Sequence, residues 1–258
     1  MTLELKEKLH FLADKYETTS FLDEDPSQFM KRYSSRRDVE TSLFITAMLS
    51  FGNRKQFIPK IRSIFDLADM HDGICNWLEN GDFESEFVPV EGSCEAVKFY
   101  RFYSYEDMRK LFRTLAHILM GGVVLGDFFR REFESEDQNR SAAERFRSVI
   151  ERVFSDCKIV PKGRGSANKR VHMFLRWMVR RGSPVDLGLW NWYSPADLII
   201  PLDTHVLQEA KKFGMLEESC TASFRTAERL TEELKQVWPD DPCKGDFALF
   251  GLGVADNE

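Results

Sequence analysis

Apolar residues recur at intervals of three and four along most of the chain, and this period constrains the fold more than any other feature. The pattern is clearest in residues 38–51 and 106–120, which end at Gly52 and Gly121. Such spacing places apolar side chains on one face of an α-helix, and a following glycine commonly ends it. Because no segment alternates convincingly between apolar and polar residues, we expect an all-α fold. Further helices are expected over residues 1–14, 26–33, 55–68, 74–78, 142–154, 204–213, 221–237 and 246–252.

The composition is that of an ordinary globular protein. Its 258 residues, 43% of them hydrophobic, are enough for one large domain or two closely packed lobes, and we treat residues 1–258 as a single domain. Residues 1–14 have the pattern of an amphipathic helix rather than of a signal peptide. No apolar run approaches the roughly 18 residues of a membrane span. We therefore expect a cytoplasmic protein that does not bind a membrane.

The cysteines and histidines have no pattern typical of a metal site. The five cysteines are scattered, odd in number and never form a CxxC pair, which argues against a disulfide framework and against a zinc or iron–sulfur site. The five histidines show no ligand spacing. We expect no metal and no cofactor.

Positive charge is concentrated in one segment of an otherwise acidic chain. Residues 158–181 contain eight Lys and Arg and no acidic residue, although the formal net charge of the protein is -6. The overall charge argues against a protein that coats nucleic acid generally, because such binding depends on phosphate neutralisation by Lys and Arg. The local excess of positive charge instead predicts one face that binds a polyanion, most simply DNA.

The helix expected within this basic segment has two faces of different character. At about 100° per residue, Lys169, Arg176 and Arg180 project from the side opposite the apolar residues. We expect this cationic side to be exposed. The apolar stripe, expected to be buried, comprises Val171, Phe174, Leu175, Met178 and Val179.

A glycine-rich turn precedes this helix. Gly163 and Gly165 tolerate positive φ and a close approach of the backbone to a ligand. Their amides and the following helix N-terminus form a suitable phosphate site. The alternative is a solvated cationic face after an ordinary loop, and the segment alone does not separate the two interpretations.

Two motifs resemble the helix-hairpin-helix DNA glycosylase superfamily. Its members carry a Gly-x-Gly hairpin, a lysine at the start of the next helix, and a Val-Asp-[Thr/Val]-His segment one helix later. Residues 201–206 resemble the second motif. For the first, either residues 163–165 match the hairpin and leave Lys169 two residues late, or residues 165–169 match with Ala167 in place of the second glycine. Lys169 and Asp203 are also further apart in sequence than is usual in the superfamily.

The extra residues between the two motifs include Trp190, Trp192 and Tyr193, which we expect to pack within the inserted loop. Residues 163–206 together with the ending at 246–253 look like an uncharacterised bacterial family of glycosylase-like proteins. The superfamily resemblance implies an all-α fold with two helical lobes around a cleft. Members with an iron–sulfur cluster hold it in cysteines after the last helix, and only Cys243 lies near that place here, so we expect no cluster.

The resemblance also implies roles for individual residues. Asp203 would stabilise the cationic sugar that forms when an N-glycosidic bond breaks. Lys169 would attack C1′ as an amine and form the Schiff base that permits strand cleavage. Phe247 and Phe250 would line the pocket for a base extruded from the duplex.

Contacts to duplex DNA are implied at two places. The first is the basic turn and helix, and the second is a helix-end loop in the N-terminal half of the chain that would fill the space of the extruded base. The residues concerned are Gly163, Arg164, Gly165, Arg170 and Arg176 in the first and Asn53 and Arg54 in the second.

Each role has a structural alternative. Asp203 stands where an N-cap is expected, a lysine near a helix start is usually solvated, and Phe247 and Phe250 are residues typical of a core. The paired lysine and aspartate motifs on a basic-faced, all-α scaffold nevertheless lead us to expect a base-excision DNA glycosylase with AP lyase activity. The alternatives are a non-catalytic protein of the same fold that senses DNA structure, and a helical protein whose basic patch binds an acidic partner.

Overall fold

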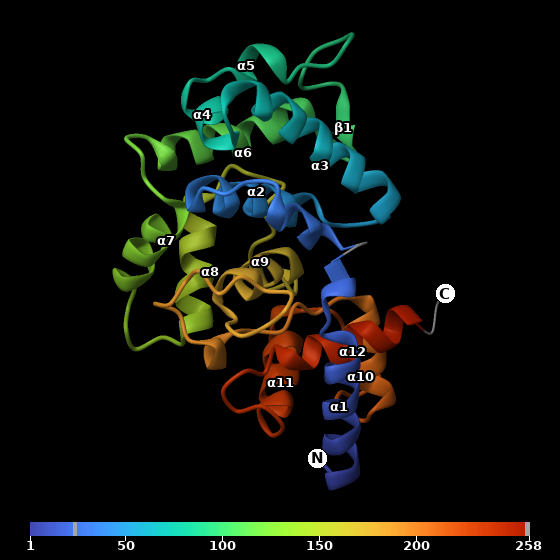
Figure 1. Cartoon of the computed structure of the whole chain (residues 1–258). Coiled ribbons are helices and arrows are strands. Elements are labelled where there is room, and N and C mark those ends of the chain that lie inside the picture. Colours follow the sequence, from blue (N-terminus) through green and yellow to red (C-terminus); the bar gives the residue numbers. More distant parts are fainter. Residues whose placement is uncertain (23–24, 256–258) are drawn as a thin grey trace. The chain divides into compact units, whose positions relative to one another are not determined.

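A computed structural model describes residues 1–22 and 25–255, and helices make up most of it (Figure 1). The prediction of an all-α protein is thus confirmed at the level of fold class. The α-helices are α1 (Leu3–Tyr16), α2 (Arg36–Leu49), α3 (Arg54–Ala68), α4 (Ile74–Glu79), α5 (Phe83–Glu86), α6 (Tyr105–Leu119), α7 (Leu125–Glu134), α8 (Ala142–Val153), α9 (Lys169–Val179), α10 (Thr204–Lys212), α11 (Phe224–Lys235) and α12 (Lys244–Ala255). Short 3₁₀ helices occupy Thr19–Leu22, Pro26–Lys31, Asp69–His71 and Pro195–Asp197.

The expectation of no strand is wrong at one place. Strands β1 (Lys98–Tyr100) and β2 (Tyr103–Ser104) pair in an antiparallel hairpin. Three and two residues are too few to show an alternating pattern, and the hairpin turns at Arg101, which has a φ of 51°. The hairpin is therefore built on a left-handed turn residue rather than on a pattern of side chains.

Polar side chains set the starts of several helices. The Ser104 side chain accepts a hydrogen bond from the amide of Asp107, whose carboxylate accepts one from the amide of Ser104, so α6 begins with a capping box. The hydroxyl of Ser35 caps α2 in the same way, without the reciprocal bond. These contacts satisfy backbone amides that a helix start leaves without partners.

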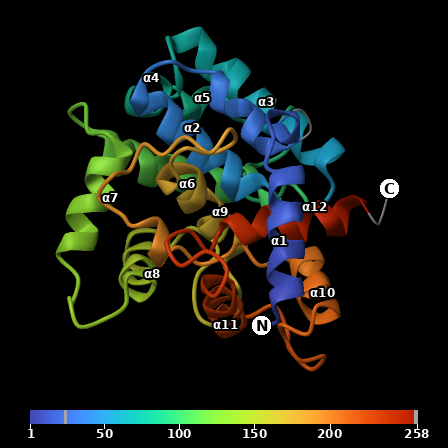
Figure 2. The ribbon, with the colours of Figure 1, turned by 60° about the horizontal axis from the view of Figure 1, so that its bottom comes forward.

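The chain divides into two compact units, Met1–Asp23 with Pro161–Glu258, and Glu24–Val160. In the first unit α1 runs beside α12, and α12 packs on α10 (Figures 1 and 2). In the second unit α2 contacts α3, α4 and α7, and every residue from Val39 to Leu49 is buried. Because α2 is buried on all sides, its apolar residues are not confined to one face.

The helices found in residues 1–22 and 25–255 are all too short or too polar to span a bilayer.

Candidate functional site

Helix α9 is buried on both faces. The predicted apolar stripe is confirmed, since Val171, Phe174 and Val179 are among its buried residues. The expectation that Arg176 and Arg180 project into solvent is wrong, because their exposed fractions are 3% and 2%. Helical period identifies which residues share a face, but it does not show which other segments cover that face.

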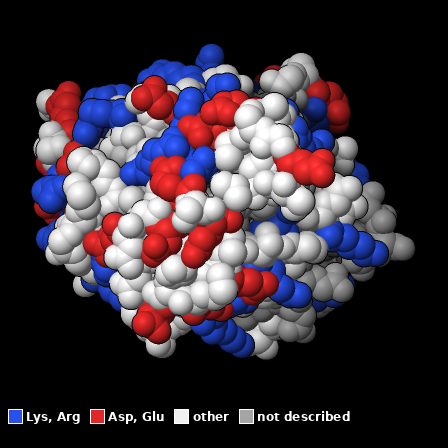
Figure 3. Space-filling model, turned by 90° about the horizontal axis from the view of Figure 1, so that it is seen from above, with Lys and Arg blue, Asp and Glu red and all other residues white. Residues whose placement is uncertain are grey.

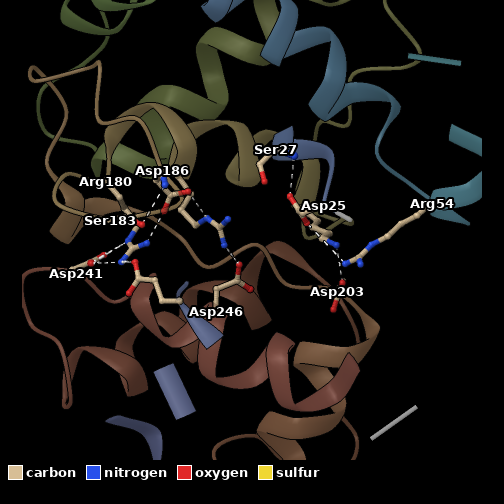
Figure 4. Close-up of polar contacts among 12 residues, drawn as sticks. Asp25, Ser27, Arg54, Arg180, Ser183, Asp186, Asp203, Asp241 and Asp246 are labelled. Atoms are coloured by element: carbon tan, nitrogen blue, oxygen red, sulfur yellow. Dashed lines mark hydrogen bonds and ion pairs between the residues drawn. The ribbon is translucent and has the colours of Figure 1, made fainter. Parts of the chain in front are cut away.

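Carboxylates from three other segments cover the two arginines. Arg176 donates to Asp246 at the start of α12, and its Nε lies 3.3 Å from Asp186 in the loop after α9. Arg180 binds the other oxygen of Asp186 at 2.6 Å and Asp241 at 2.8 Å (Figure 4). Glu17 adds a further contact to Arg180 at 2.8 Å. Arg176 is therefore a core residue, buried among carboxylates.

Burial sets the charge state of this cluster. It raises the pKa of Asp246 to about 6, although Arg176 opposes the shift. Burial likewise raises the pKa of Asp186 against the attraction of both arginines. Removing a carboxylate from water disfavours its charged form, so only close guanidinium groups keep such residues ionised near neutral pH.

Lys169 and Asp203 converge. The Lys169 Nζ donates to the Asp203 Oδ2 at 2.7 Å across 34 positions of sequence. Lys169 is the first residue of α9, and Asp203 is the N-cap of α10, where its Oδ1 accepts from the amide of Val206 at 2.9 Å. The N-cap alternative and the pairing with lysine are thus both present, one on each carboxylate oxygen. The exposed fractions of the two side chains are 31% and 16%.

The surroundings of Asp203 keep its carboxylate ionised. Burial alone would raise the pKa of Asp203. The charge and hydrogen bond of Lys169, the amide of Val206 and the nearby His205 outweigh burial, so the pKa is lowered. The site therefore holds a fixed negative charge beside an amine that reaches solvent.

One of the two predicted base-pocket residues lies at this pair. The Lys169 Nζ is 5.2 Å from the centre of the Phe250 ring, which also meets the His205 ring edge-on at 6.2 Å. Phe250 is half-buried. Phe247 is completely buried beneath the guanidinium of Arg176, at 4.5 Å from the ring centre. Phe247 therefore presents no surface to solvent in this structure, unlike the half-buried Phe250.

The turn before α9 is more irregular than a symmetric Gly-x-Gly hairpin. Gly163 has a φ of 86°, whereas Gly165 lies outside the left-handed region. The Asn168 Nδ2 donates to the carbonyl of Gly163 at 2.8 Å, and Asn168 itself has a φ of 49°. The turn is thereby tied to the start of α9. Arg164 and Gly165 are exposed on it, and Arg170 is half-buried.

Asn53 and Arg54 stand in the second unit, at the start of α3. The Asn53 Oδ1 caps this helix by accepting from the amide of Lys55 at 2.8 Å. The Arg54 guanidinium lies 3.9 Å from Asp25, whose other oxygen accepts from the amide of Ser27 (Figure 4). Both side chains therefore have structural contacts within their own unit.

The inserted loop packs as expected. Trp190 and Tyr193 are buried, and Trp190 stacks on Trp192 with ring centres 5.2 Å apart. The amide of Trp190 donates to the carbonyl of Met178 at 2.7 Å, so the loop closes over the end of α9. Its acidic member Asp186, together with Asp246, was missed by sequence reasoning, because neither residue has a motif of its own.

In the described residues, no group of three or more His, Cys, Asp or Glu side chains has an arrangement able to hold a metal ion.

Comparison with known proteins gives a family for the chain. No curated protein and no solved structure matches it significantly. One family model matches residues 25–255, which is most of the chain. The chain therefore belongs to the family described as "Protein of unknown function (DUF2400)".

Proposed function

We propose that this protein is a DNA base-excision glycosylase with AP lyase activity that acts on a damaged base in duplex DNA. The observation that carries the proposal is the 2.7 Å contact between Lys169 Nζ and Asp203 Oδ2. It joins an amine at the start of one helix to a carboxylate at the start of another, which is the pair that the glycosylase resemblance implies. The half-buried Phe250 ring beside the amine supplies an apolar surface for the sugar or the base.

The two groups have complementary roles in the proposed reaction. Breaking the N-glycosidic bond leaves positive charge on the sugar, and the ionised Asp203 stabilises it. The departing base takes the bonding electron pair and needs a proton, and the Lys169 ammonium is the donor at the site. The neutral amine that results attacks C1′ and forms a C1′–N bond. The C1′–O4′ bond then breaks, O4′ takes up a proton that the nitrogen loses, and the protonated Schiff base remains. Because the pKa of Asp203 is lowered, the carboxylate does not compete for this proton.

DNA contact in this proposal is local. The basic residues at the turn and first turn of α9 that stay at least partly accessible are Lys162, Arg164, Lys169 and Arg170. On the face shown in Figure 3, Lys and Arg side chains lie among Asp and Glu side chains. A small basic site next to the reacting pair is consistent with a protein that binds one point of the duplex rather than a long stretch.

Borohydride trapping tests the proposal. The wild-type protein is incubated with duplexes that carry 8-oxoguanine, uracil, an oxidised pyrimidine or an abasic site. We expect a covalent adduct that Lys169→Gln abolishes and that Asp203→Asn strongly reduces while keeping an asparagine N-cap on α10. Lys244→Gln is the matched control, because Lys244 also begins a helix and pairs with a carboxylate, Asp14, at 3.0 Å. An adduct that survives in Lys169→Gln would refute the assignment.

One observation favours a second function, a non-catalytic protein that senses DNA structure. Asp203 and Lys169 satisfy each other, and Asp203 also caps α10, so both have a structural role without any substrate. This alternative predicts tight binding to abasic or mismatched duplex with no trapped adduct and no released base. The same duplex panel therefore separates the two functions.

A further inference from the structure

An exposed aromatic side chain lies at the tip of the β1–β2 hairpin. Phe102 is 60% exposed, although it is a large apolar residue in a protein with an ample core. Its ring contacts that of Tyr103, with centres 4.6 Å apart, and that of Phe51, with centres 5.6 Å apart. Phe102 is thus the outermost ring of a small aromatic group and presents one side to solvent.

The hairpin is fastened to the loop between α2 and α3. The Tyr100 hydroxyl donates to the carbonyl of Phe51 at 2.5 Å, and β1 lies beside α3 (Figure 1). Gly52, with a φ of 82°, allows the approach. A Cβ on Gly52 would collide with the Arg101 guanidinium and lie 2.9 Å from the Tyr100 hydroxyl. The hairpin tip is therefore held at a fixed position rather than left as a loose turn.

The residue next to Phe102 is strained. Arg101 has a φ of 51°, a conformation that costs free energy for any residue with a Cβ. A glycine at this turn would avoid the cost, yet the chain places a guanidinium there, 5.8 Å from the centre of the Phe51 ring. Retention of a strained residue at an exposed tip points to a role for its side chain.

Basic residues occur on the hairpin itself and at the start of α3, the helix that β1 contacts. Arg101, Lys98 and Lys55 are exposed on the hairpin and at the start of α3. Arg54 follows in the same segment, with Asp25 at 3.9 Å as its acidic neighbour. An exposed ring flanked by cations matches a nucleobase flanked by phosphates, because a base offers a flat face for stacking and its backbone offers negative charge.

We propose that the tip of the β1–β2 hairpin binds an unpaired nucleobase of DNA. The Phe102 ring stacks on the base, and Arg101, Lys98 and Lys55 contact the phosphates on either side. The residues of this site belong to the second unit, whereas Lys169 and Asp203 belong to the first. The inference shares its DNA partner with the proposed function but does not depend on the reaction.

The test is the binding of fluorescein-labelled duplexes, followed by anisotropy, with and without one bulged adenine. We expect wild type to prefer the bulged duplex. Phe102→Ala should lose about fivefold to 150-fold in affinity for the bulged duplex, the range expected for one lost stacking contact, with little change for the fully paired duplex. Phe102→Trp should restore the preference, because tryptophan offers a larger stacking surface.

Phe11→Ala is the matched control. Phe11 is an exposed phenylalanine of the other unit, at 67%, and its removal tests whether any exposed ring matters. Arg101→Ala should weaken binding to both duplexes and reduce the salt dependence by about one phosphate contact. That pattern distinguishes phosphate contact from base stacking.

Three results would overturn the inference. They are equal affinity of wild type for the two duplexes, unchanged preference in Phe102→Ala, and a change of oligomeric state in Phe102→Ala that shows the ring to be covered by a second copy of the chain. None of these results depends on trapping at Lys169. A protein that forms the adduct but shows no bulge preference would refute this inference alone.

Discussion

The buried side chain of His172 should make the folded protein less stable in acid. It lies one helical turn after Lys169, is 5% exposed and stacks on Phe224 with ring centres 5.8 Å apart. Within residues 1–22 and 25–255, no group forms a hydrogen bond with its Nδ1. Burial lowers the pKa of His172 from 6.5 to about 4, because the charged ring cannot be solvated there.

The lowered pKa of His172 means that acid destabilises the folded protein. Between pH 6.5 and about 4 the unfolded chain protonates at His172 and the folded chain does not, so stability present above pH 6.5 is lost as pH falls. The full difference corresponds to about 3 kcal/mol, and about 2 kcal/mol of it is lost by pH 5. Substitution by phenylalanine keeps a ring on Phe224 and removes the titration.

Urea unfolding at pH 7.5 and pH 5.0 measures the effect. The free energy of unfolding of His172→Phe should fall between the two pH values by about 2 kcal/mol less than that of wild type. His117→Gln, which removes an exposed histidine on α6, is the control for the loss of one histidine. Equal pH dependence in wild type and His172→Phe would refute the reasoning.

Three further predictions concern the buried cluster and the candidate site. Arg176→Ala leaves Asp246 without its guanidinium partner and Asp186 with Arg180 alone, so it should lower the free energy of unfolding by about 3–5 kcal/mol in urea, whereas Arg131→Ala, at an exposed position, should not. Asp203→Asn keeps the cap on α10, so Asp203→Ala should be less stable than Asp203→Asn by about 1 kcal/mol in thermal unfolding. Because the pKa of Asp246 is raised to about 6, the wild type should lose stability relative to Asp246→Asn as pH rises from 4 to 7, by about 3 kcal/mol in urea titrations.

Most of the helices were predictable because each carries its own periodic pattern, whereas α5 (Phe83–Glu86) and α7 (Leu125–Glu134) lie where no helix was predicted. Residues 38–51 and 106–120 gave α2 and α6 to within a few residues, since local spacing and a terminal glycine suffice there. The β1–β2 hairpin was not predictable, because five strand residues around a left-handed arginine have neither alternation nor a glycine turn. Apolar spacing and a terminal glycine thus predict a helix where the residues of that helix alone determine its structure.

The candidate site could not be predicted from local sequence patterns, because it depends on contacts between segments far apart in the chain. The contact of Lys169 with Asp203 joins the start of α9 to the start of α10, and only the resemblance to glycosylases suggested it beforehand. Helix α9 shows most clearly what helical periodicity cannot predict. Its basic side was expected to face solvent, but Asp186 from the loop after α9 and Asp246 from α12 cover it and make it part of the core. A basic residue indicates an exposed position only where no carboxylate from another segment packs against it.

The buried cluster and the candidate site are coupled through Asp246, and this coupling has a sign that can be tested. After burial and Arg176, the largest influences on the pKa of Asp246 are Asp203, which raises it, and Lys169, which lowers it. Asp203→Asn should therefore lower the pKa of Asp246, and Lys169→Gln should raise it. The carboxyl chemical shift of Asp246, titrated by NMR in both variants and in Lys244→Gln as a control, measures the two changes.

Shifts of the pKa of the same sign in the two site variants would mean that the substitutions act by loosening the packing around α12. Opposite shifts would show that the charge at Lys169 and Asp203 is felt in the core, so that an anion bound at the pair would also change the protonation of Asp246.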